Sequence, residues 1–234
     1  MRDQCDASHW QAVTSKEHWL AAMWPSVRSW LPAAPATVVE IGCGSLGGFV
    51  PMLSGDGYEA IGVDPAAPEG PAYRRVEFER VDLPATVDAI VASTSLHHVA
   101  DPAAVLERVA DALGGEGIVI VVEWNWEAFD EATARWCLER QVQPDGWLRR
   151  RLDAWADSGQ TWENAFQGWA VEHGLHGART LIAELDERFD RIVFDRGPYL
   201  FTELVDTSAS DEQRAIDAGE VPALRVDYVG RPHL

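Results

Sequence analysis

The stretch of sequence that decides the fold is Val38-Val39-Glu40-Ile41-Gly42-Cys43-Gly44-Ser45-Leu46-Gly47-Gly48. Its apolar, β-branched start predicts a strand, and the glycines predict a turn that leads into a helix. Glycine has no Cβ, so a ligand can approach the backbone closely, and the first N–H groups of the following helix are free to bind it. Glycines at this spacing are a weak signal alone, and a tight turn without a ligand is the alternative interpretation.

A carboxylate follows the next predicted strand. Asp64 closes the segment Ile61-Gly62-Val63-Asp64 and stands 22 residues after Gly42. A carboxylate in this position can accept hydrogen bonds from both hydroxyls of a ribose. Nicotinamide, flavin and S-adenosylmethionine (SAM) cofactors share that ribose, so these two elements indicate an adenosine-type site without choosing among them. A strand-end carboxylate that caps a turn is the alternative.

Short apolar runs rich in β-formers alternate with helix-sized stretches in this part of the chain, a pattern typical of βαβ units and a parallel sheet. Several runs are almost continuously apolar, which indicates that helices cover both faces of the sheet. The N-terminal segment from residue 8 to 30, with Trp10 among its aromatics, is predicted to be helical and to end at prolines. The predicted strands are residues 37–41, 60–63, 76–81, 87–92, 118–122, 191–194 and 224–229.

The pattern divides the chain into four segments. Residues 1–36 are predicted to form a helical lid, and residues 37–124 the cofactor-binding core. Residues 125–188 are rich in Trp and lack strand signals, so they are predicted to form a helical insert. Residues 189–234 are predicted to add the last strands to the core sheet.

Two further segments distinguish between the cofactors. Val81-Asp82-Leu83-Pro84 follows the third predicted strand, and Leu96-His97-His98-Val99-Ala100-Asp101-Pro102 follows the fourth. With these segments, residues 38–124 resemble class I SAM-dependent methyltransferases, especially their broad small-molecule group. The resemblance implies an α/β, Rossmann-like, doubly wound and mostly parallel seven-stranded sheet, with a helical insert after strand five and an antiparallel last strand. It implies SAM as cofactor and methyl transfer as activity, and does not specify the acceptor.

The resemblance also implies which residues hold the cofactor. Asp64 would bind the ribose hydroxyls. Asp82 would accept a hydrogen bond from the exocyclic amine of adenine, with Leu83 beside the ring. The backbone around Ser93 would face the methionine part. The first cofactor motif would be formed by Glu40, Gly42, Cys43 and Gly44.

The chain departs from the family pattern in the glycine loop. The family usually has Gly two residues after the position of Gly44, whereas this chain has Leu46 followed by Gly47 and Gly48. The loop is therefore expected to be one residue longer or to bend differently.

Candidate catalytic groups follow the fourth and fifth strands. We hypothesise that His97 or His98, with a preference for His97, deprotonates or orients the acceptor. The alternative is that both histidines pack or cap a turn. Glu123 ends the fifth strand, and Trp124 and Trp126 follow it; all three are predicted to point at the same crevice. The alternative is that Glu123 is a hydrogen-bonded strand end and that the two Trp residues are core aromatics.

The insert offers further open interpretations. Arg149-Arg150-Arg151 indicates either a site for an acidic acceptor or a solvated helix face, and His173 and His176 indicate a helix end more than a metal ligand pair. Five Trp residues either shape an apolar or planar acceptor pocket or fill the core of the insert. They are Trp136, Trp147, Trp155, Trp162 and Trp169.

Composition excludes several classes of function. The 234 residues carry a formal net charge of −19, which disfavours nucleic-acid partners because neutralising a phosphate backbone requires basic surface. No apolar run is long enough to span a membrane, and three cysteines without metal-ligand spacing predict neither zinc nor disulfides. A cytoplasmic protein with a small-molecule acceptor is expected, and nothing in the sequence specifies its oligomeric state.

Two other functions share part of these motifs. A Rossmann oxidoreductase that uses NAD(P) would have the same glycine loop and Asp64, but Asp82 and the segment around His97 and His98 count against it. A regulatory protein that binds SAM without turnover would retain every cofactor motif.

Overall fold

The computed structural model describes residues 14–113 and 115–233. They form a seven-stranded sheet with strand order β3-β2-β1-β4-β5-β7-β6. Strands β1 to β5 pair in parallel, whereas β7 runs antiparallel to both β5 and β6. The predicted Rossmann-like, mostly parallel sheet with an antiparallel last strand is therefore confirmed. The strands are β1 (Thr37–Ile41), β2 (Glu59–Val63), β3 (Tyr73–Arg74), β4 (Ala89–Ser93), β5 (Ile118–Trp124), β6 (Phe189–Gly197) and β7 (Arg225–Pro232).

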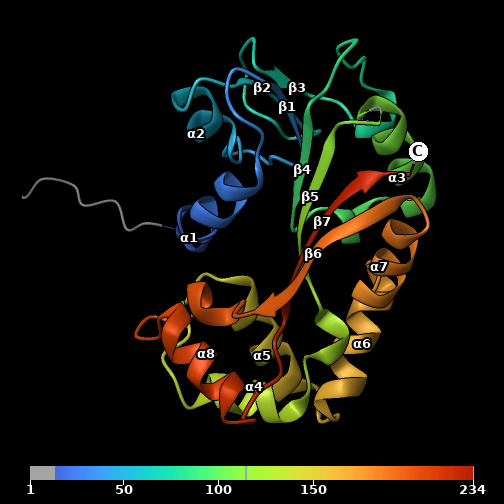
Figure 1. The fold of residues 1–234 in the computed structure, drawn as a ribbon. Coiled ribbons are helices and arrows are strands. Elements are labelled where there is room, and N and C mark those ends of the chain that lie inside the picture. The colour runs from blue at the N-terminus through green and yellow to red at the C-terminus, as the bar shows by residue number, and fades with distance from the viewer. Residues whose placement is uncertain (1–13, 114, 234) are drawn as a thin grey trace, which may run out of the picture.

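Helices cover both faces of the sheet, and a helical lobe lies beyond the carboxyl ends of its parallel strands (Figure 1). α1 and α2 pack on one face, and α3 and α7 pack on the other. The helices are α1 (Ser15–Trp30), α2 (Val50–Gly55), α3 (Pro102–Leu113), α4 (Glu131–Leu138), α5 (Trp147–Ser158), α6 (Trp162–Glu172), α7 (Ala178–Asp186) and α8 (Ala209–Asp217). Short 3₁₀ turns are η1 (Phe78–Arg80), η2 (Leu96–His98), η3 (Trp126–Ala128) and η4 (Leu200–Glu203).

Helix α1 is fixed over the carboxyl end of β4. It begins with a capping box, in which the Thr14 side chain accepts from the N–H of Glu17 and the Glu17 carboxylate accepts from the N–H of Thr14. The indole Nε1 of Trp19 donates to Oγ of Ser93 at 3.1 Å, and this pair is buried. The start of α1 therefore reaches the edge of the sheet where β4 ends. Trp10 of the predicted N-terminal helix lies outside the described residues.

The helical lobe is assembled from two separate parts of the chain. Helices α4, α5 and α6 come from the connection between β5 and β6, whereas η4 and α8 come from the connection between β6 and β7. Both parts share one apolar core that contains Trp162, Phe166 and Leu224. Helix α7 leaves the lobe and packs on the sheet beside α3. The lobe is therefore not identical with the predicted insert of residues 125–188.

The third predicted strand is wrong in position. Residues 76–81 were expected to be extended, but residues 78–80 form the 3₁₀ turn η1, and β3 consists only of Tyr73 and Arg74. Phe78 turns its ring into the core on the α3 face, and the guanidinium of Arg108 lies 5.8 Å from the ring centroid. The local apolar pattern predicted a strand, but burial of Phe78 beneath α3 stabilises a turn.

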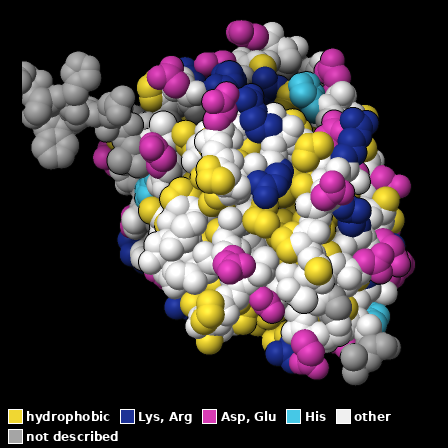
Figure 2. Space-filling model, turned by 90° about the horizontal axis from the view of Figure 1, so that it is seen from above, with side chains coloured by type: hydrophobic (Ala, Val, Ile, Leu, Met, Phe, Trp, Pro, Cys, Tyr) yellow, Lys and Arg dark blue, Asp and Glu magenta, His cyan; other side chains and the backbone are white. Residues whose placement is uncertain are grey.

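The surface carries charge of both signs. On the face at the end of the sheet away from the helical lobe, acidic and basic side chains are intermingled with apolar ones (Figure 2). Within the described residues, no helix combines the length and the apolar character needed to cross a membrane.

Candidate active site

Two adjoining cavities open at the carboxyl ends of the parallel strands. The glycine-loop cavity has a volume of about 620 Å³, and the aromatic cavity has a volume of about 500 Å³. The glycine-loop cavity is lined by Ile41, Gly42, Val63, Asp64, Pro65, Glu77, Phe78, Glu79, Arg80, Thr94, Ser95, His98, Val99 and Ala100. The aromatic cavity is lined by Ser15, Lys16, Trp19, Thr94, His97, His98, Trp124, Trp147, Arg150, Arg151, Trp169, His173, Leu175, Tyr199, Thr202 and Glu203.

The glycine loop requires backbone conformations that favour glycine. Gly42, Gly44, Gly47 and Gly48 all have positive φ. The N–H of Gly42 donates to the carbonyl of Val63 at 2.8 Å, which ties the start of the loop to the end of β2. A Cβ on Gly44 would meet no atom within 4 Å, so the space beside Gly44 is open. A ligand can therefore approach the loop at this residue.

The departure in the loop has a clear structural outcome. The chain passes through turns from Gly44 to Phe49, and α2 begins only at Val50. The left-handed conformations of Gly47 and Gly48 delay the helix, which then spans only 6 residues. The loop is thus longer than a direct strand-to-helix turn.

Glu40 supports this loop from beneath. Its side chain is buried, and Oε2 accepts from the N–H of Phe49 at 2.7 Å. Burial raises the pKa of Glu40 to about 8, although N–H donors and Lys16 oppose that rise. Glu40 lines neither cavity, and its hydrogen bond to Phe49 supports the loop. Cys43, also buried, packs its Sγ towards Gly62, and burial raises the pKa of its thiol to about 12.

Asp64 lies in the wall of the glycine-loop cavity, as its position after β2 suggested. Its Oδ2 accepts from the N–H of Gly44 at 3.0 Å, and its Oδ1 accepts from the N–H of Ala66 at 2.7 Å. The carboxylate is thereby oriented by two backbone donors. Asp82 is exposed and Leu83 is half-buried, and neither lines this cavity. Residues 77–80, which precede them in the chain, do line it.

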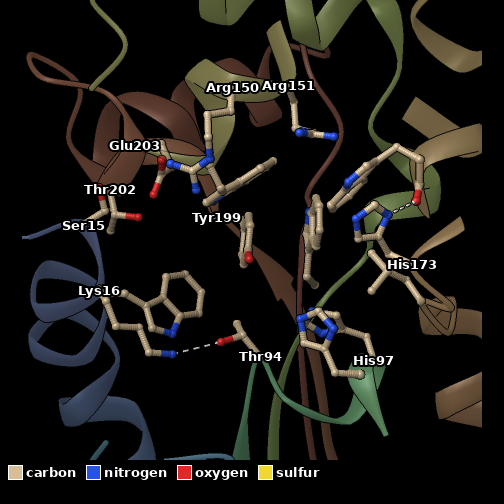
Figure 3. Close-up of a pocket in the computed structure, with 16 residues that line it drawn as sticks. Ser15, Lys16, Thr94, His97, Arg150, Arg151, His173, Tyr199, Thr202 and Glu203 are labelled. Atoms are coloured by element: carbon tan, nitrogen blue, oxygen red, sulfur yellow. Dashed lines mark hydrogen bonds between the residues drawn. The ribbon is translucent and has the colours of Figure 1, made fainter. Parts of the chain in front are cut away.

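Thr94 occupies the junction of the two cavities. Ser93 ends β4 and is buried, with its Oγ bound by Trp19, and the next residue turns outward into both cavities. Thr94 has a φ of 51°, an uncommon conformation for a β-branched residue. Its N–H donates to the carbonyl of Val122 at 2.8 Å, and its Oγ1 accepts from Nζ of Lys16 at 3.1 Å (Figure 3). Sequence reasoning did not single out Thr94.

Glu123 is the most constrained side chain of the site. Its Oε1 accepts from the N–H groups of Ser95 and Leu96 at 2.8 and 2.7 Å, and its Oε2 accepts from the N–H of Trp124 at 2.8 Å. Burial opposes ionisation of Glu123, but His97 and these donors outweigh it and hold its pKa below the ordinary value. The carboxylate is therefore charged and fixed between β5 and η2.

Glu123 in turn orients His97. Oε2 of Glu123 lies 2.7 Å from Nδ1 of His97, and both side chains are buried. Nδ1 donates in this pair because the carboxylate can only accept. In the neutral imidazole Nε2 is then the nitrogen with the lone pair. Among the described residues Nε2 has no hydrogen-bond partner, and His97 lines the aromatic cavity. The sequence placed Glu123 and the histidines at one crevice but did not predict their pairing.

His98 lies beside His97, with 4.1 Å between the ring centroids, and lines both cavities. Partial burial is the main cause that lowers the pKa of His98 to about 4, and the proximity of His97 is the second. Its imidazole is therefore neutral at neutral pH, and it can donate or accept one hydrogen bond at the junction.

Lys16 enters the site from α1. It is the only lysine of the chain, and it lies at the edge of the aromatic cavity. Burial lowers its pKa, although the charges of Glu40, Glu123 and Asp64 favour its protonated form. Its rarity was visible in the sequence, but its place in the site follows only from the packing of α1.

Trp and Tyr rings form part of the wall of the aromatic cavity. The rings of Trp124 and Tyr199 are stacked at 5.5 Å with an interplanar angle of 5°, and Trp147 lies 4.8 Å from Trp124. Trp19 and Trp169 complete these walls. The indole Nε1 of Trp124 is buried without a hydrogen-bond partner in the described residues.

The Trp residues of the insert divide between the two interpretations. Trp147 and Trp169 line the aromatic cavity. Trp136 and Trp162 are buried in the core of the lobe, and Trp155 packs against that core. Both interpretations therefore describe part of the insert. Trp126 also joins this core, and its Nε1 donates to the carbonyl of His176.

Tyr199 reaches the cavity from the second part of the lobe. Glu212 of α8 is buried, and its carboxylate accepts from the N–H groups of Tyr199, Leu200 and Phe201 at 2.8, 3.1 and 2.7 Å. These bonds fix the start of η4 and the ring before it. Burial raises the pKa of the Tyr199 hydroxyl well above its ordinary value. No sequence signal connected Tyr199 with the site.

His173 and His176, the two histidines of the predicted insert, each lie within hydrogen-bond distance of a backbone carbonyl. Nε2 of His176 is 2.9 Å from the carbonyl of Val99, and Nδ1 of His173 is 2.8 Å from the carbonyl of Trp169. In the described part of the chain, no group of three or more His, Cys, Asp or Glu side chains could hold a metal ion.

The fold and the paired cavities define the class of this protein. A sheet of this order, with a glycine loop after β1 and a carboxylate after β2, is a Rossmann-like fold, the class that binds adenosine-type cofactors at the carboxyl ends of its strands.

Comparison with known proteins identifies the family. Residues 16–188 match a family model described as a methyltransferase domain. Among curated proteins, no sequence matches this chain. Since the family model covers most of the chain, this protein belongs to the methyltransferase domain family.

Solved structures support the fold. N-methyltransferase NodS from Bradyrhizobium japonicum, in complex with S-adenosylhomocysteine, is 13% identical and has a TM-score of 0.52, covering 98% of this chain and 94% of its own. Geranyl diphosphate C-methyltransferase from Streptomyces coelicolor is 16% identical and has a TM-score of 0.52, and the alignment covers 98% of this chain and 88% of that enzyme. A SAM-dependent methyltransferase from Mesorhizobium loti is 19% identical with a TM-score of 0.50, covering 90% and 97%.

Proposed function

We propose that this methyltransferase transfers a methyl group, by in-line displacement, to a small molecule bound in the aromatic cavity. The observation that carries the proposal is the shared wall, because Thr94 and His98 line both cavities. A cofactor in the glycine-loop cavity and an acceptor in the aromatic cavity would meet at these two residues. Alignment of two reactants can supply a large part of the rate of such a reaction.

Groups in and beside the glycine-loop cavity support the binding of SAM there. The open backbone at Gly44 accommodates close approach, and Asp64 presents an oriented carboxylate for the ribose hydroxyls. Lys16 provides a cation near the junction for the carboxylate of the methionine part. We assign the adenine contact to residues 77–80, because they line the cavity and Asp82 and Leu83 do not.

SAM, when bound, supplies a methyl group activated by a positively charged sulfur. The chain must then align the acceptor and remove its proton where it has one to lose. Nε2 of His97 can take that proton, because Nδ1 already donates to Glu123. The charge of Glu123 then stabilises the imidazolium that forms. His98, neutral and next to His97, can orient the acceptor.

The proposal of a small acceptor rests on size and charge. A cavity of about 500 Å³ is within the range of small-molecule sites, and a chain with a net charge of −19 is poorly suited to nucleic acid. Geranyl diphosphate, named for the Streptomyces coelicolor enzyme of the same fold, is also a small molecule. We include a cytoplasmic location in the proposal, because the thiols of Cys43 and Cys137 are buried and free, as suits a reducing compartment.

We further propose that α1 and the helical lobe act as a lid. Lys16 and Trp19 of α1, with Trp147 and Trp169 of the lobe, enclose the aromatic cavity above the strand ends. Exclusion of water from such a cavity strengthens the electrostatic interactions inside it.

Calorimetry with SAM, S-adenosylhomocysteine and NAD tests the cofactor part of the proposal. Binding of the first two without NAD is expected. Transfer of labelled methyl from SAM to members of a panel of small aromatic and aliphatic nucleophiles tests turnover. If SAM binds but its methyl group is transferred neither to a panel member nor to a ligand that copurifies with the protein, a regulatory protein would be favoured. Absence of SAM binding would overturn the proposal.

A further inference from the structure

The aromatic cavity has a charge opposite to that of the protein. The whole chain has a formal net charge of −19, yet the cavity wall contains Lys16, Arg150 and Arg151 and one carboxylate, Glu203. Glu203 is buried, and burial raises its pKa. Cations thus outnumber anions in the wall even if Glu203 is ionised. A local field of this sign attracts an anion once it has entered the cavity.

Arg150 and Arg151 differ from their neighbour Arg149. Arg149 and Arg150 are both exposed, but Arg149 forms a salt bridge with Asp153 at 3.0 Å on the outer side of α5. Within the described residues, Arg150 and Arg151 form no salt bridge, although both line the cavity. NH1 of Arg150 donates to the carbonyl of Asp145 at 2.7 Å, which leaves further guanidinium donors free.

Arg151 is also held in place. Its guanidinium lies 4.7 Å from the centroid of the Trp169 ring, a cation–π contact that fixes its orientation. It is half-buried, and it lies one turn after the buried Leu148 on the same side of α5. A cation that is partly removed from water and lacks an acidic partner gains more from an anionic ligand than an exposed one.

The cavity has two chemically different ends. In Figure 3, Arg150 and Arg151 lie at one end, Thr94 and His97 lie at the other, and Tyr199 lies between them. Thr94 marks the junction with the glycine-loop cavity. Between the ends, the rings of Trp124, Trp147 and Tyr199 offer flat apolar faces, which favour a planar ligand.

We propose that the acceptor is a planar, aromatic oxyanion that binds with its anionic group against Arg150 and Arg151 and its nucleophilic atom towards Thr94 and His97. This inference rests on the proposed function, because it names the chemical class of the acceptor. A carboxylate and a phosphate monoester share the required chemistry. The aromatic part of the acceptor occupies the cavity. Because its anionic group is held at the arginine end, its nucleophilic atom lies at the opposite end, near the junction.

A matched pair of fluorescent probes tests the inference without knowledge of the acceptor. Anilinonaphthalenesulfonate is an aromatic anion, and phenylnaphthylamine has the same rings without the charge. Titrations use the full chain with S-adenosylhomocysteine present, and the probe emission is recorded. The wild type is expected to bind the anionic probe at least about tenfold more tightly than the neutral probe. Raising NaCl from about 0.05 M to about 0.5 M should weaken only the anionic probe.

Variants locate the effect. The double variant R150Q/R151Q is expected to lose about tenfold or more in affinity for the anionic probe and to bind the neutral probe as before. R150K/R151K should recover part of the loss, and the matched control R149Q should behave as wild type. A wild type that binds both probes equally, or an R149Q variant that loses as much as the double variant, would overturn the inference.

Competition distinguishes the two kinds of oxyanion. Naphthoate, naphthyl phosphate and neutral naphthylmethanol are compared as displacers of the anionic probe, and the better of the two anions identifies the group. Equal displacement by naphthylmethanol overturns the inference. Calorimetry with S-adenosylhomocysteine on each variant reports the cofactor site separately. If the wild type does not bind S-adenosylhomocysteine, the proposed function is contradicted. If it binds S-adenosylhomocysteine but shows no preference for the anionic probe, only the inference about the acceptor is contradicted.

Discussion

Nδ1 of His97 and Oε2 of Glu123 lie 2.7 Å apart, and both side chains are buried at the carboxyl ends of β4 and β5. Because Glu123 is already held by three backbone N–H groups, the imidazole has a defined tautomer and orientation. The pair therefore combines a structural role with a chemical one, and substitutions should separate the two.

His97→Ala is expected to lower kcat by about 10²- to 10⁴-fold for an acceptor that loses a proton, with a small change in KM. Added imidazole should restore part of the rate, because it can enter the space that the side chain leaves. His98→Ala serves as comparison and should retain more activity. Near-normal turnover of His97→Ala at saturating acceptor would contradict a role in proton removal.

Glu123→Gln should act on stability as well as on rate. An amide cannot accept at both of its ends, so at least one of the N–H groups of Ser95, Leu96 and Trp124 loses its partner. An unsatisfied buried donor costs about 1–3 kcal/mol, and urea unfolding should show a loss of this size. An unchanged midpoint of unfolding would show that the N–H groups find water instead.

Two single variants, Asp64→Asn and Asp82→Asn, are compared to test the cofactor cavity. Asn keeps the shape of Asp64 but weakens acceptance from ribose hydroxyls, so affinity for S-adenosylhomocysteine should fall about tenfold or more. Asp82 is exposed and outside the cavity wall, and its substitution should change the affinity less than about twofold. Calorimetry measures both. A large loss in Asp82→Asn would restore this residue as the adenine contact.

Much of the cofactor half of the site could be predicted from the sequence. β1 has the predicted bounds, and Gly42 and Asp64 line a cavity at the carboxyl ends of the parallel strands, where the rule for such sheets places ligands. These residues lie close together in the sequence, and local patterns therefore identify them. β3 was misplaced because only two of its residues pair with β2, which leaves almost no pattern to detect.

The acceptor half could not be predicted in the same way. Lys16, Arg151 and Tyr199 come from α1, α5 and the connection before η4, and only tertiary packing brings them together. The three arginines at 149–151 left two interpretations open because neighbouring residues on a helix point in different directions, and the buried face of α5 was not known. The structure places Arg149 outward and the other two at the cavity.

Glu40 should make stability depend on pH. Burial raises its pKa to about 8 in the folded protein, above the ordinary value of 4.5. The folded state therefore binds the proton more tightly than the unfolded state. Its contribution to stability is complete below the unfolded pKa and is lost as pH rises through the folded pKa. Each unit of difference corresponds to about 1.4 kcal/mol.

The free energy of unfolding of the cofactor-free wild type is thus expected to fall between pH values of 4.5 and 8, and that of Glu40→Gln should be flatter. Glu59→Gln, at an exposed site in β2, is the control and should follow the wild type. Denaturant titrations at several pH values measure the difference. Parallel curves for wild type and Glu40→Gln would show that Glu40 is not the group responsible.

Thr94→Gly should separate stability from function at the junction of the two cavities. A β-branched residue at a φ of 51° is strained by about 1–3 kcal/mol, which glycine relieves, although glycine also increases the entropy of the unfolded chain. The melting temperature of Thr94→Gly should therefore be equal to or above that of the wild type. The substitution also removes the hydroxyl that accepts from Nζ of Lys16 at 3.1 Å, so Lys16 becomes mobile and affinity for SAM should fall several-fold. Thr94→Ser keeps the hydroxyl and is the matched control, with affinity close to that of the wild type. If Thr94→Gly instead melted several degrees lower with unchanged affinity, Thr94 would be a packing residue and the junction would not depend on it.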